Sequence, residues 1–330
     1  MNALASNPRR IDRLEQVRLG ETTQWIRIRG LDVANPALLL IPQGPGLPII
    51  QEADDFQRST HLEDDFTVVY WDPRGCGKSA RSPKASTPIT LEQMVTDAVD
   101  LIEVLCAQLG TRSVFVAGFS LGGTIGALAA ARVPDRVAAL IAVGMDVRFD
   151  DAERVAYDYV LAEAKRRHNT RALRQLLRIG PPPHLDAVKF GTRVRWLADF
   201  GGIMRQKTYP GIVGTMLRQL FASGAYSPAD LVATFRGMRE VQVQLLPDLA
   251  GLDLHTMLPR LEVPIYMLQG LHDYAAPLDP AESFFRNLIA PKGKQFVPFR
   301  ASAHMPHYEE PDLFARTLLG TLHGVDAVGR

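Results

Sequence analysis

The chain has 330 residues and a mass of 36.4 kDa, with 46% hydrophobic and 22% charged residues. This balance is typical of a folded globular protein and excludes a disordered or fibrous chain. The 37 Lys and Arg residues nearly equal the 36 Asp and Glu residues, so no net charge favours binding to nucleic acid or to an anionic membrane.

The chain carries no pattern that indicates secretion or membrane insertion. Arg9 and Arg10 are not followed by an apolar segment, and the longest apolar run, at residues 137–143, is too short to span a bilayer. Two cysteines, Cys76 and Cys106, are too few for a disulfide framework or a zinc site built on cysteine. We therefore predict a soluble cytoplasmic protein with no nucleic-acid or membrane partner.

Short apolar segments alternate with helical patterns, which is typical of a parallel sheet covered by helices on both faces. Because such strands are buried on both sides, they read as nearly continuous apolar runs. The predicted strands are 37–41, 66–71, 113–117, 137–143, 264–269 and 295–299.

Three helices of the predicted core have recognisable ends. Apolar residues form one stripe over 90–109, where Thr90 and Gln93 suggest a capping box and Gly110 follows the last turn. A helix over 121–132 must end before Pro134, since proline cannot continue it, and a last helix is predicted over 311–319.

The strand signal disappears over residues 146–255, where amphipathic helices are interrupted at 181–183, 209–211 and 227–228. We interpret this segment as a helical cap inserted into a core made of residues 1–145 and 256–330, because long insertions at the ligand-facing end of a parallel sheet often form lids. The alternative is that these helices only cover apolar surface. The predicted fold class is α/β, with a mostly parallel twisted sheet.

One motif indicates a serine nucleophile. The sequence Gly118-Phe119-Ser120-Leu121-Gly122 lies directly between a predicted strand and a predicted helix. In this context, Gly-x-Ser-x-Gly holds a serine hydroxyl on a strained turn, and the helix N-terminus offers N–H groups to an oxyanion. A chance match is the alternative, but the flanking elements favour Ser120 as the nucleophile.

A serine with an ordinary hydroxyl needs a base, and the base needs a carboxylate to orient it. Of the eight histidines, His304 is the best placed, because it follows the final strand by a short loop. His307 is expected to pack or to line the rim. For the carboxylate we choose Asp273, in the turn after the penultimate strand, over Asp279 and Asp146. The order serine, acid, histidine is specific to one fold.

Acyl transfer also requires donors aimed at the developing oxyanion. The backbone N–H of Leu121 is one predicted donor, and Gly44, in the loop after the first predicted strand, is the other. No metal is predicted, because His304, His307 and the adjacent glutamates lack the spacing of a metal-binding helix. No other cofactor is expected.

Residues 72–79 contain Gly-Lys-Ser after a strand, as nucleotide phosphate loops do, but Asp72 stands where that loop requires glycine. We predict instead a tight glycine turn in which Asp72 pairs with Arg74. Cys76 then has no assigned role.

With these residues, the chain resembles the proline iminopeptidase family of α/β-hydrolases over nearly its whole length. The matching motifs are the D-x-R-G-x-G-x-S loop at 72–79, the nucleophile elbow at 118–123, the G-x-x-D-x-x-x-P acid turn at 270–277 and the histidine loop at 302–314. The resemblance implies an α/β-hydrolase fold, His304 rather than His307 as the catalytic base, and residues 146–255 as a cap over the active site. It also implies Gly44 as oxyanion donor, since 44–46 match the end of the H-G-G-P-G loop.

Some positions depart from the family pattern. Pro42 and Gln43 replace the first residues of the oxyanion loop, and Leu121 stands where proline iminopeptidases usually carry Trp. Those enzymes hold the substrate amine with acidic cap residues, whereas residues 146–207 contain 13 Lys or Arg against 8 Asp or Glu. This basic excess is either a solvated surface or a sign of an anionic substrate. Glu240, Asp248 and Asp253 remain candidates to face the cleft.

We therefore predict a cofactor-free serine hydrolase that cleaves a small ester or amide through an acyl-enzyme. Its substrate would be a small molecule or a short peptide. One alternative is an aminopeptidase of the proline iminopeptidase type, and another is a non-catalytic protein of the same fold that binds a ligand or partner. A third is cleavage of a C–C bond by the same residues.

Overall fold

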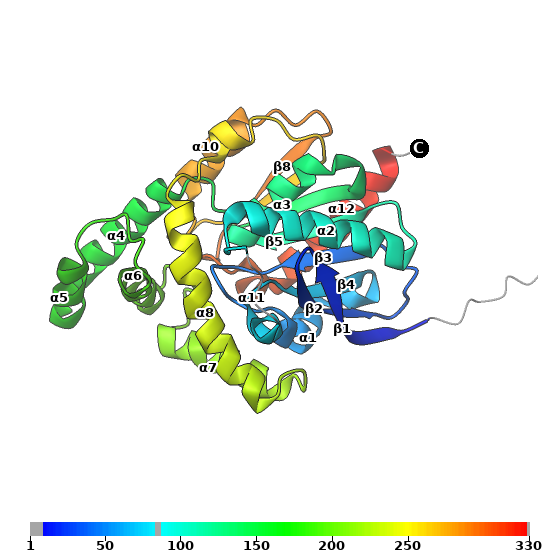
Figure 1. The fold of residues 1–330 in the computed structure, drawn as a ribbon. Coiled ribbons are helices and arrows are strands. Elements are labelled where there is room, and N and C mark those ends of the chain that lie inside the picture. The colour runs from blue at the N-terminus through cyan, green and yellow to red at the C-terminus, as the bar shows by residue number, and fades with distance from the viewer. Residues whose placement is uncertain (1–8, 83–86, 329–330) are drawn as a thin grey trace, which may run out of the picture.

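A mixed sheet lies at the centre of the computed structural model, which describes residues 9–82 and 87–328 (Figure 1). The strand order is β1-β2-β4-β3-β5-β6-β7-β8. Neighbouring strands from β4 through β3 to β8 are parallel, whereas β2 is antiparallel to both β1 and β4. The strands are β1 Ile11–Leu19, β2 Thr22–Gly30, β3 Ala37–Ile41, β4 Thr67–Asp72, β5 Val114–Phe119, β6 Val137–Val143, β7 Ile265–Gly270 and β8 Lys294–Phe299.

The six predicted strands are confirmed as β3 to β8, and no end differs from its predicted position by more than two residues. The hairpin of β1 and β2 was not predicted. Every second residue of β2 is buried and the others are half-buried, so this strand alternates instead of forming an apolar run. A search for two-residue alternation would have found it.

Helices cover both faces of the sheet. Residues of α2, α3 and α10 pack in one apolar cluster, and residues of α1 and α12 pack in the other. The helices outside the inserted segment are α1 Ala53–Thr60, α2 Leu91–Leu109, α3 Leu121–Arg132, α10 Leu278–Asn287, α11 Pro306–Glu309 and α12 Pro311–Val328.

The predicted ends of α2 are largely confirmed. Thr90 Oγ1 accepts a hydrogen bond from Gln93 N at 3.1 Å, and Gly110 ends the helix with φ at 64°. The Gln93 side chain, however, donates to Asp97 Oδ1 at 3.0 Å. The last helix, α12, runs nine residues beyond its predicted end at residue 319.

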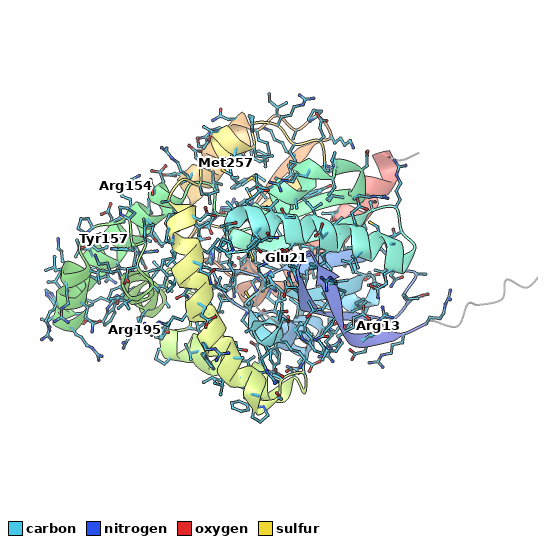
Figure 2. All side chains as sticks on the ribbon, in the orientation of Figure 1. Arg13, Glu21, Arg154, Tyr157, Arg195 and Met257 are labelled. Carbon is cyan, nitrogen blue, oxygen red and sulfur yellow. The ribbon has the colours of Figure 1, made fainter. Side chains whose placement is uncertain are left out.

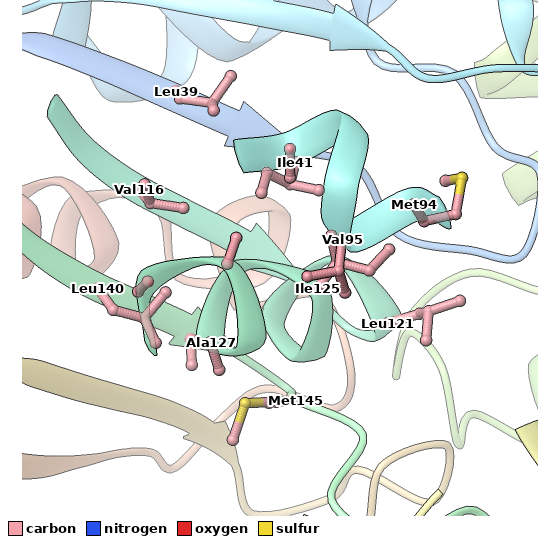
Figure 3. Packing of buried hydrophobic residues seen from close by; sticks show 14 of the residues in the cluster. Leu39, Ile41, Met94, Val95, Val116, Leu121, Ile125, Ala127, Leu140 and Met145 are labelled. Carbon is pink, nitrogen blue, oxygen red and sulfur yellow. The ribbon is translucent and has the colours of Figure 1, made fainter. Parts of the chain in front are cut away.

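Strand β3 shows how the sequence builds two core layers. Leu39 and Ile41 belong to the apolar cluster on one face, and Leu38 and Leu40 belong to the cluster on the other, because successive side chains of a strand point to opposite faces. All four side chains are fully buried. Figure 3 shows Leu39 and Ile41 together with residues of α3 on the first face.

Between β6 and β7 the chain forms only helices, as predicted for residues 146–255. They are α4 Phe149–Arg166, α5 Thr170–Ile179, α6 Ala187–Asp199, α7 Tyr209–Ala222, α8 Pro228–Leu249 and α9 Leu254–Met257. Helices α4, α5 and α6 lie at the left of Figure 1 and share an apolar cluster of their own. Figure 2 shows Arg154, Tyr157 and Arg195 on this group, at the opposite end of the view from Arg13 of β1. The division into core and cap remains a prediction.

The long helix α8 packs closely on the loops of the sheet. A Cβ atom at Gly46 would lie 2.9 Å from Met238 Cα of α8. Lys78 Nζ is 3.1 Å from Asp230 Oδ2 in the first turn of the same helix. Tyr226, just before α8, donates to Asp72 Oδ2 at 2.6 Å. This helix is therefore anchored to the core by packing, an ion pair and a hydrogen bond.

The predicted pairing of Asp72 with Arg74 is wrong. Asp72 is buried and accepts hydrogen bonds from the backbone N–H groups of Ile49, Ile50 and Lys78 at 2.8 to 3.1 Å. Arg74 instead forms two hydrogen bonds with Asp97 of α2, at 2.5 and 2.7 Å. Asp72 thus satisfies donors of the loop after β3, which local sequence patterns do not reveal.

Candidate active site

Ser120 lies in the turn that joins β5 to α3. Its φ and ψ of 54° and −124° are strained for a residue other than glycine, and its N–H donates to Val143 O at 2.8 Å. A Cβ atom at Gly122 would overlap the carbonyl oxygens of Ile41 and Pro42, so only glycine fits this close approach of α3 to the end of β3. The turn has the geometry of a nucleophile elbow.

His304 and Asp273 lie side by side in loops that follow β8 and β7. His304 Nδ1 is 2.8 Å from Asp273 Oδ2, and both side chains are buried. Asp273 Oδ1 accepts the backbone N–H groups of Ala275 and Ala276 at 2.8 and 2.9 Å, and Gln269 donates to Oδ2 at 3.2 Å. An ionised Asp273 held in this way accepts the Nδ1 proton and leaves Nε2 as the basic nitrogen of the neutral ring.

The end of β6 makes room for this pair. Gly144 has φ at 52°, and a Cβ atom there would lie 3.0 Å from His304 Nδ1 and 3.1 Å from Asp273 Oδ2. The segments after β5, β6, β7 and β8 therefore converge at the carboxyl edge of the sheet, where ligands bind in folds of this class.

The pKa of His304 is raised above its ordinary value. Burial alone lowers it, but the charge and the hydrogen bond of Asp273 outweigh burial, and the charges of Asp146 and Glu309 act in the same direction. The protonated ring is thus stabilised inside the protein. This property suits a base that must hold a proton during a reaction.

Asp146 follows β6 and contacts the predicted nucleophile. Ser120 Oγ donates to Asp146 Oδ2 at 3.2 Å, while the Asp146 carbonyl accepts from Thr124 Oγ1 of α3 at 2.6 Å. Within the described ranges, no hydrogen bond joins Ser120 to His304. We considered Asp146 from the sequence only as a rival of Asp273, and its contact with Ser120 was not foreseen.

The carboxyl of Asp146 is surrounded by protein, although part of the residue stays accessible. Burial, with a smaller contribution from the negative charge of Asp273, raises the pKa of Asp146 to about 6. The charges of His304 and Arg193 and the hydrogen bond from Ser120 oppose this rise. Asp146 is therefore still ionised near pH 7.

The two residues predicted to form the oxyanion hole are neighbours. A Cβ atom at Gly44 would lie 3.3 Å from Leu121 Cδ2. Leu121 is the first residue of α3, so its N–H belongs to the first turn, where backbone donors lack intrahelical acceptors. The positive end of the helix dipole lies at the same place.

The loop between α6 and α7 docks on both the acid turn and the histidine loop. His304 N donates to Ile203 O at 2.9 Å, and Tyr274 N donates to Gly202 O at 3.2 Å. The rings of Tyr274 and Tyr159, the latter from α4, stack at 3.7 Å between centroids. The inserted segment thus contacts the backbone of His304 itself, which sequence patterns did not indicate.

Two adjacent glutamates hold the histidine loop. Glu309 accepts Ala303 N at 2.8 Å through Oε2 and Arg205 N, from the loop between α6 and α7, at 2.7 Å through Oε1. Glu310 Oε2 accepts both Ser302 Oγ and the N–H of residue 301, at 2.6 and 3.0 Å. Only Glu309 of the two therefore ties the histidine loop to the inserted segment.

The other histidine of this loop is a packing residue. His307 is buried, its ring lies 4.6 Å from that of Phe119, and burial, together with the charge of His304, lowers its pKa to about 3. Asp279 is exposed in the first turn of α10. Cys76 is buried, and burial together with the charge of Asp72 raises its pKa.

The three acidic residues that were candidates to face the cleft have partners in other parts of the chain. Asp248 Oδ2 accepts Leu91 N of α2 at 2.6 Å, and Asp253 caps α9 through His255 N at 2.9 Å. Glu240 Oε1 lies 3.8 Å from Arg236 Nε on the same helix. None of these contacts involves Ser120.

Residues 9–82 and 87–328 contain no group of three or more His, Cys, Asp or Glu side chains that could hold a metal ion. No helix in this part of the chain is long and apolar enough to cross a membrane.

Comparison with known proteins agrees with this architecture. A sequence profile described as the α/β-hydrolase fold matches residues 36–311. The chain is 28% identical over 309 residues to a protein of Bacillus subtilis (strain 168) named probable aminopeptidase YbaC, covering 92% of this chain and 94% of the relative. It is 33% identical over 133 residues to rhodomycin D methylesterase DauP of Streptomyces sp. (strain C5), covering 39% of this chain and 42% of the relative.

A solved structure extends the comparison to three dimensions. The crystal structure of proline iminopeptidase from Mycobacterium smegmatis matches with a TM-score of 0.66 and 21% identity, over 96% of this chain and all of that one. The predicted fold and the resemblance to proline iminopeptidases are thus confirmed. Because the profile covers most of its length, the protein belongs to the α/β-hydrolase family of enzymes.

Proposed function

We propose that the protein is a serine hydrolase that cleaves small esters or amides through an acyl-enzyme. The observation that carries the proposal is that the strained turn of Ser120 and the buried pair of His304 and Asp273 both border the end of β6. There Ser120 N–H donates to Val143 O, and a Cβ atom at Gly144 would lie 3.0 Å from His304 Nδ1. The hydrogen bond from His304 Nδ1 keeps the imidazole oriented, and the charge of Asp273 keeps the ring basic although burial opposes this.

In the first step the Ser120 hydroxyl turns from Asp146 toward the imidazole of His304. His304 removes the hydroxyl proton while the serine oxygen attacks the carbonyl carbon, and the N–H groups of Gly44 and Leu121 hold the resulting oxyanion. His304 then gives the proton to the leaving alcohol or amine. Water repeats the sequence on the acyl-enzyme and releases the acid.

Labelling with a fluorophosphonate, followed by mass-spectrometric mapping, tests the nucleophile. We expect Ser120 to be modified, and Ser120→Ala to lose both the label and turnover while keeping the wild-type circular dichroism spectrum. Loss of a serine nucleophile costs on the order of 10⁶ in kcat where it has been measured. Modification at another residue, or retained turnover in Ser120→Ala, would contradict the proposal.

A second candidate is aminopeptidase activity. The Bacillus subtilis relative that shares 28% identity over most of the chain is named a probable aminopeptidase. Release of proline from a proline-headed chromogenic amide, compared with hydrolysis of a simple acyl ester, separates the two candidates. Hydrolysis of the ester without any release of proline from the amide would count against the peptidase.

A further inference from the structure

One loop of the inserted segment supplies carbonyl oxygens to both loops that carry the predicted catalytic pair. We call it the docking loop, residues 200–205, between α6 and α7. Ile203 O accepts the backbone N–H of His304 at 2.9 Å, and Gly202 O accepts that of Tyr274, the residue after Asp273, at 3.2 Å. A shift of this loop therefore acts on the backbone at both partners of the 2.8 Å contact between His304 Nδ1 and Asp273 Oδ2.

Tyr159 of α4 connects the docking loop to the acid turn. Its hydroxyl donates to Phe200 O at 2.7 Å. Its ring stacks on that of Tyr274, with 3.7 Å between the centroids and 13° between the planes. Arg167, directly after α4, also donates to Phe200 O, at 3.2 Å. One side chain thus contacts the first residue of the docking loop and the neighbour of Asp273.

The acid turn is packed into the apolar cluster of the inserted helices. This cluster consists of buried residues of α4, α5 and α6 together with Phe200, and Ile203, Tyr274 and Ala275 pack against it. The backbone N–H of Ala275 is also one of the donors to Asp273 Oδ1, at 2.8 Å. The position of this carboxylate beyond the end of β7 therefore depends on packing against the inserted helices as well as on the sheet.

We propose that Tyr159 is a positioning residue, which keeps the docking loop and the acid turn together so that Asp273 and His304 are aligned only while the inserted helices are docked. The inference rests on the proposed function, because alignment matters only if His304 takes a proton from Ser120. It gives the insertion a second role besides covering the site. Movement of these helices away from the sheet breaks the hydrogen bond to His304 N, so closure and alignment of the base are one event.

The titration of His304 reports this alignment. Burial lowers its pKa, but the charge and the hydrogen bond of Asp273 raise it above the ordinary value. A longer distance between the two side chains weakens both effects of Asp273, so the pKa falls and the acid limb of the pH–rate profile moves to lower pH. A change that only destabilises the fold leaves this limb in place. The other titratable groups that act together with His304 are Asp146, Glu309 and His307.

Modification of Ser120 by a fluorophosphonate measures the base independently of substrate. Ser120 Oγ bonds to phosphorus, fluoride leaves, and the hydroxyl proton passes to His304 and on to water. The rate is followed as a function of pH in wild type, Tyr159→Phe and Tyr159→Leu, which remove the hydrogen bond alone and the hydrogen bond with the stack. Tyr157→Phe and Tyr157→Leu are the matched controls (Figure 2), because the Tyr157 hydroxyl of the same helix donates to Leu176 O of α5, at 3.1 Å.

We expect Tyr159→Leu to react about ten- to a hundredfold more slowly on the pH plateau, as for a catalytic group displaced by up to roughly 1 Å, with its acid limb at lower pH. Tyr159→Phe keeps the stack and should lose about two- to tenfold, as for one hydrogen bond, with a limb that moves in the same direction. Both Tyr157 variants should keep the wild-type rate and limb, although Tyr157→Leu loses stability at a buried position.

A wild-type rate in Tyr159→Leu, a slower reaction with an unmoved acid limb, or an equal loss in Tyr157→Leu would overturn the inference alone. If the circular dichroism spectrum shows that Tyr159→Leu does not fold, Tyr159→Phe decides by the same two readouts. Failure of the reagent to modify Ser120 in wild type would overturn the proposed function with it.

Discussion

Gly144 offers a sharp test of how the fold holds the imidazole and its carboxylate. Changing Gly144 to alanine adds one Cβ atom, 3.0 Å from His304 Nδ1 and 3.1 Å from Asp273 Oδ2. Gly110, at the end of α2, is the matched control. It also has a positive φ, 64° against 52°, but a Cβ atom there has no heavy atom within 4 Å.

The backbone strain of the two variants should be similar. A left-handed alanine costs roughly 1–2 kcal/mol, so both variants should melt a few degrees below wild type, on the order of 2–8 °C. Only Gly144→Ala must also displace the buried pair by a few tenths of an ångström. Since a 1 Å misplacement of a catalytic group costs roughly a hundredfold, we expect about a tenfold fall in kcat.

Calorimetry and steady-state kinetics on a chromogenic ester measure both quantities. Gly110→Ala should lose stability and keep kcat, whereas Gly144→Ala should lose both. The reasoning is refuted if Gly144→Ala keeps the wild-type kcat, or if Gly110→Ala loses as much activity.

Three further predictions follow from contacts of α2 and the histidine loop. Asp97→Ala should lower the free energy of unfolding by about 3–5 kcal/mol in urea titrations, because it leaves the buried guanidinium of Arg74 without its ion-pair partner. Glu92→Ala, on the exposed side of the same helix, is the control and should cost less than about 1 kcal/mol. Glu309→Gln should lower kcat by about tenfold, because the two oxygens of the Glu309 carboxylate each accept a backbone N–H and an amide has only one oxygen. Glu310→Gln is the control and should keep a kcat near that of wild type, because both donors to Glu310 bind the same oxygen. Asp273→Asn should lower kcat by roughly 10⁴-fold and move the acid limb of the pH–rate profile to lower pH, since the imidazole of His304 loses the charge that raises its pKa. An acid limb that does not move would contradict this role of Asp273. Equal losses in Asp97→Ala and Glu92→Ala, or in Glu309→Gln and Glu310→Gln, would contradict the other two predictions.

Local patterns in the sequence were sufficient for the elements that carry the proposed chemistry. The nucleophile elbow around Ser120 was visible because a strand, a turn and a helix follow one another within a few residues. Asp273 and His304 were chosen because each follows a predicted strand, and parallel strands bring such positions to one edge of the sheet. These inferences need only residue spacing and the direction of the strands.

Tertiary structure alone decided which side chains meet across long distances in the chain. Arg74 pairs with Asp97 instead of Asp72, because Asp72 is occupied by the N–H groups of the loop after β3. Asp146 reaches Ser120, and Ile203 caps the backbone of His304, through the way β6 and the inserted helices pack on the sheet. The sequence determined the strands, the turns and their order; the packing of distant segments decided the hydrogen-bond partners of buried polar groups, since each must be satisfied by whatever lies beside it in the folded chain.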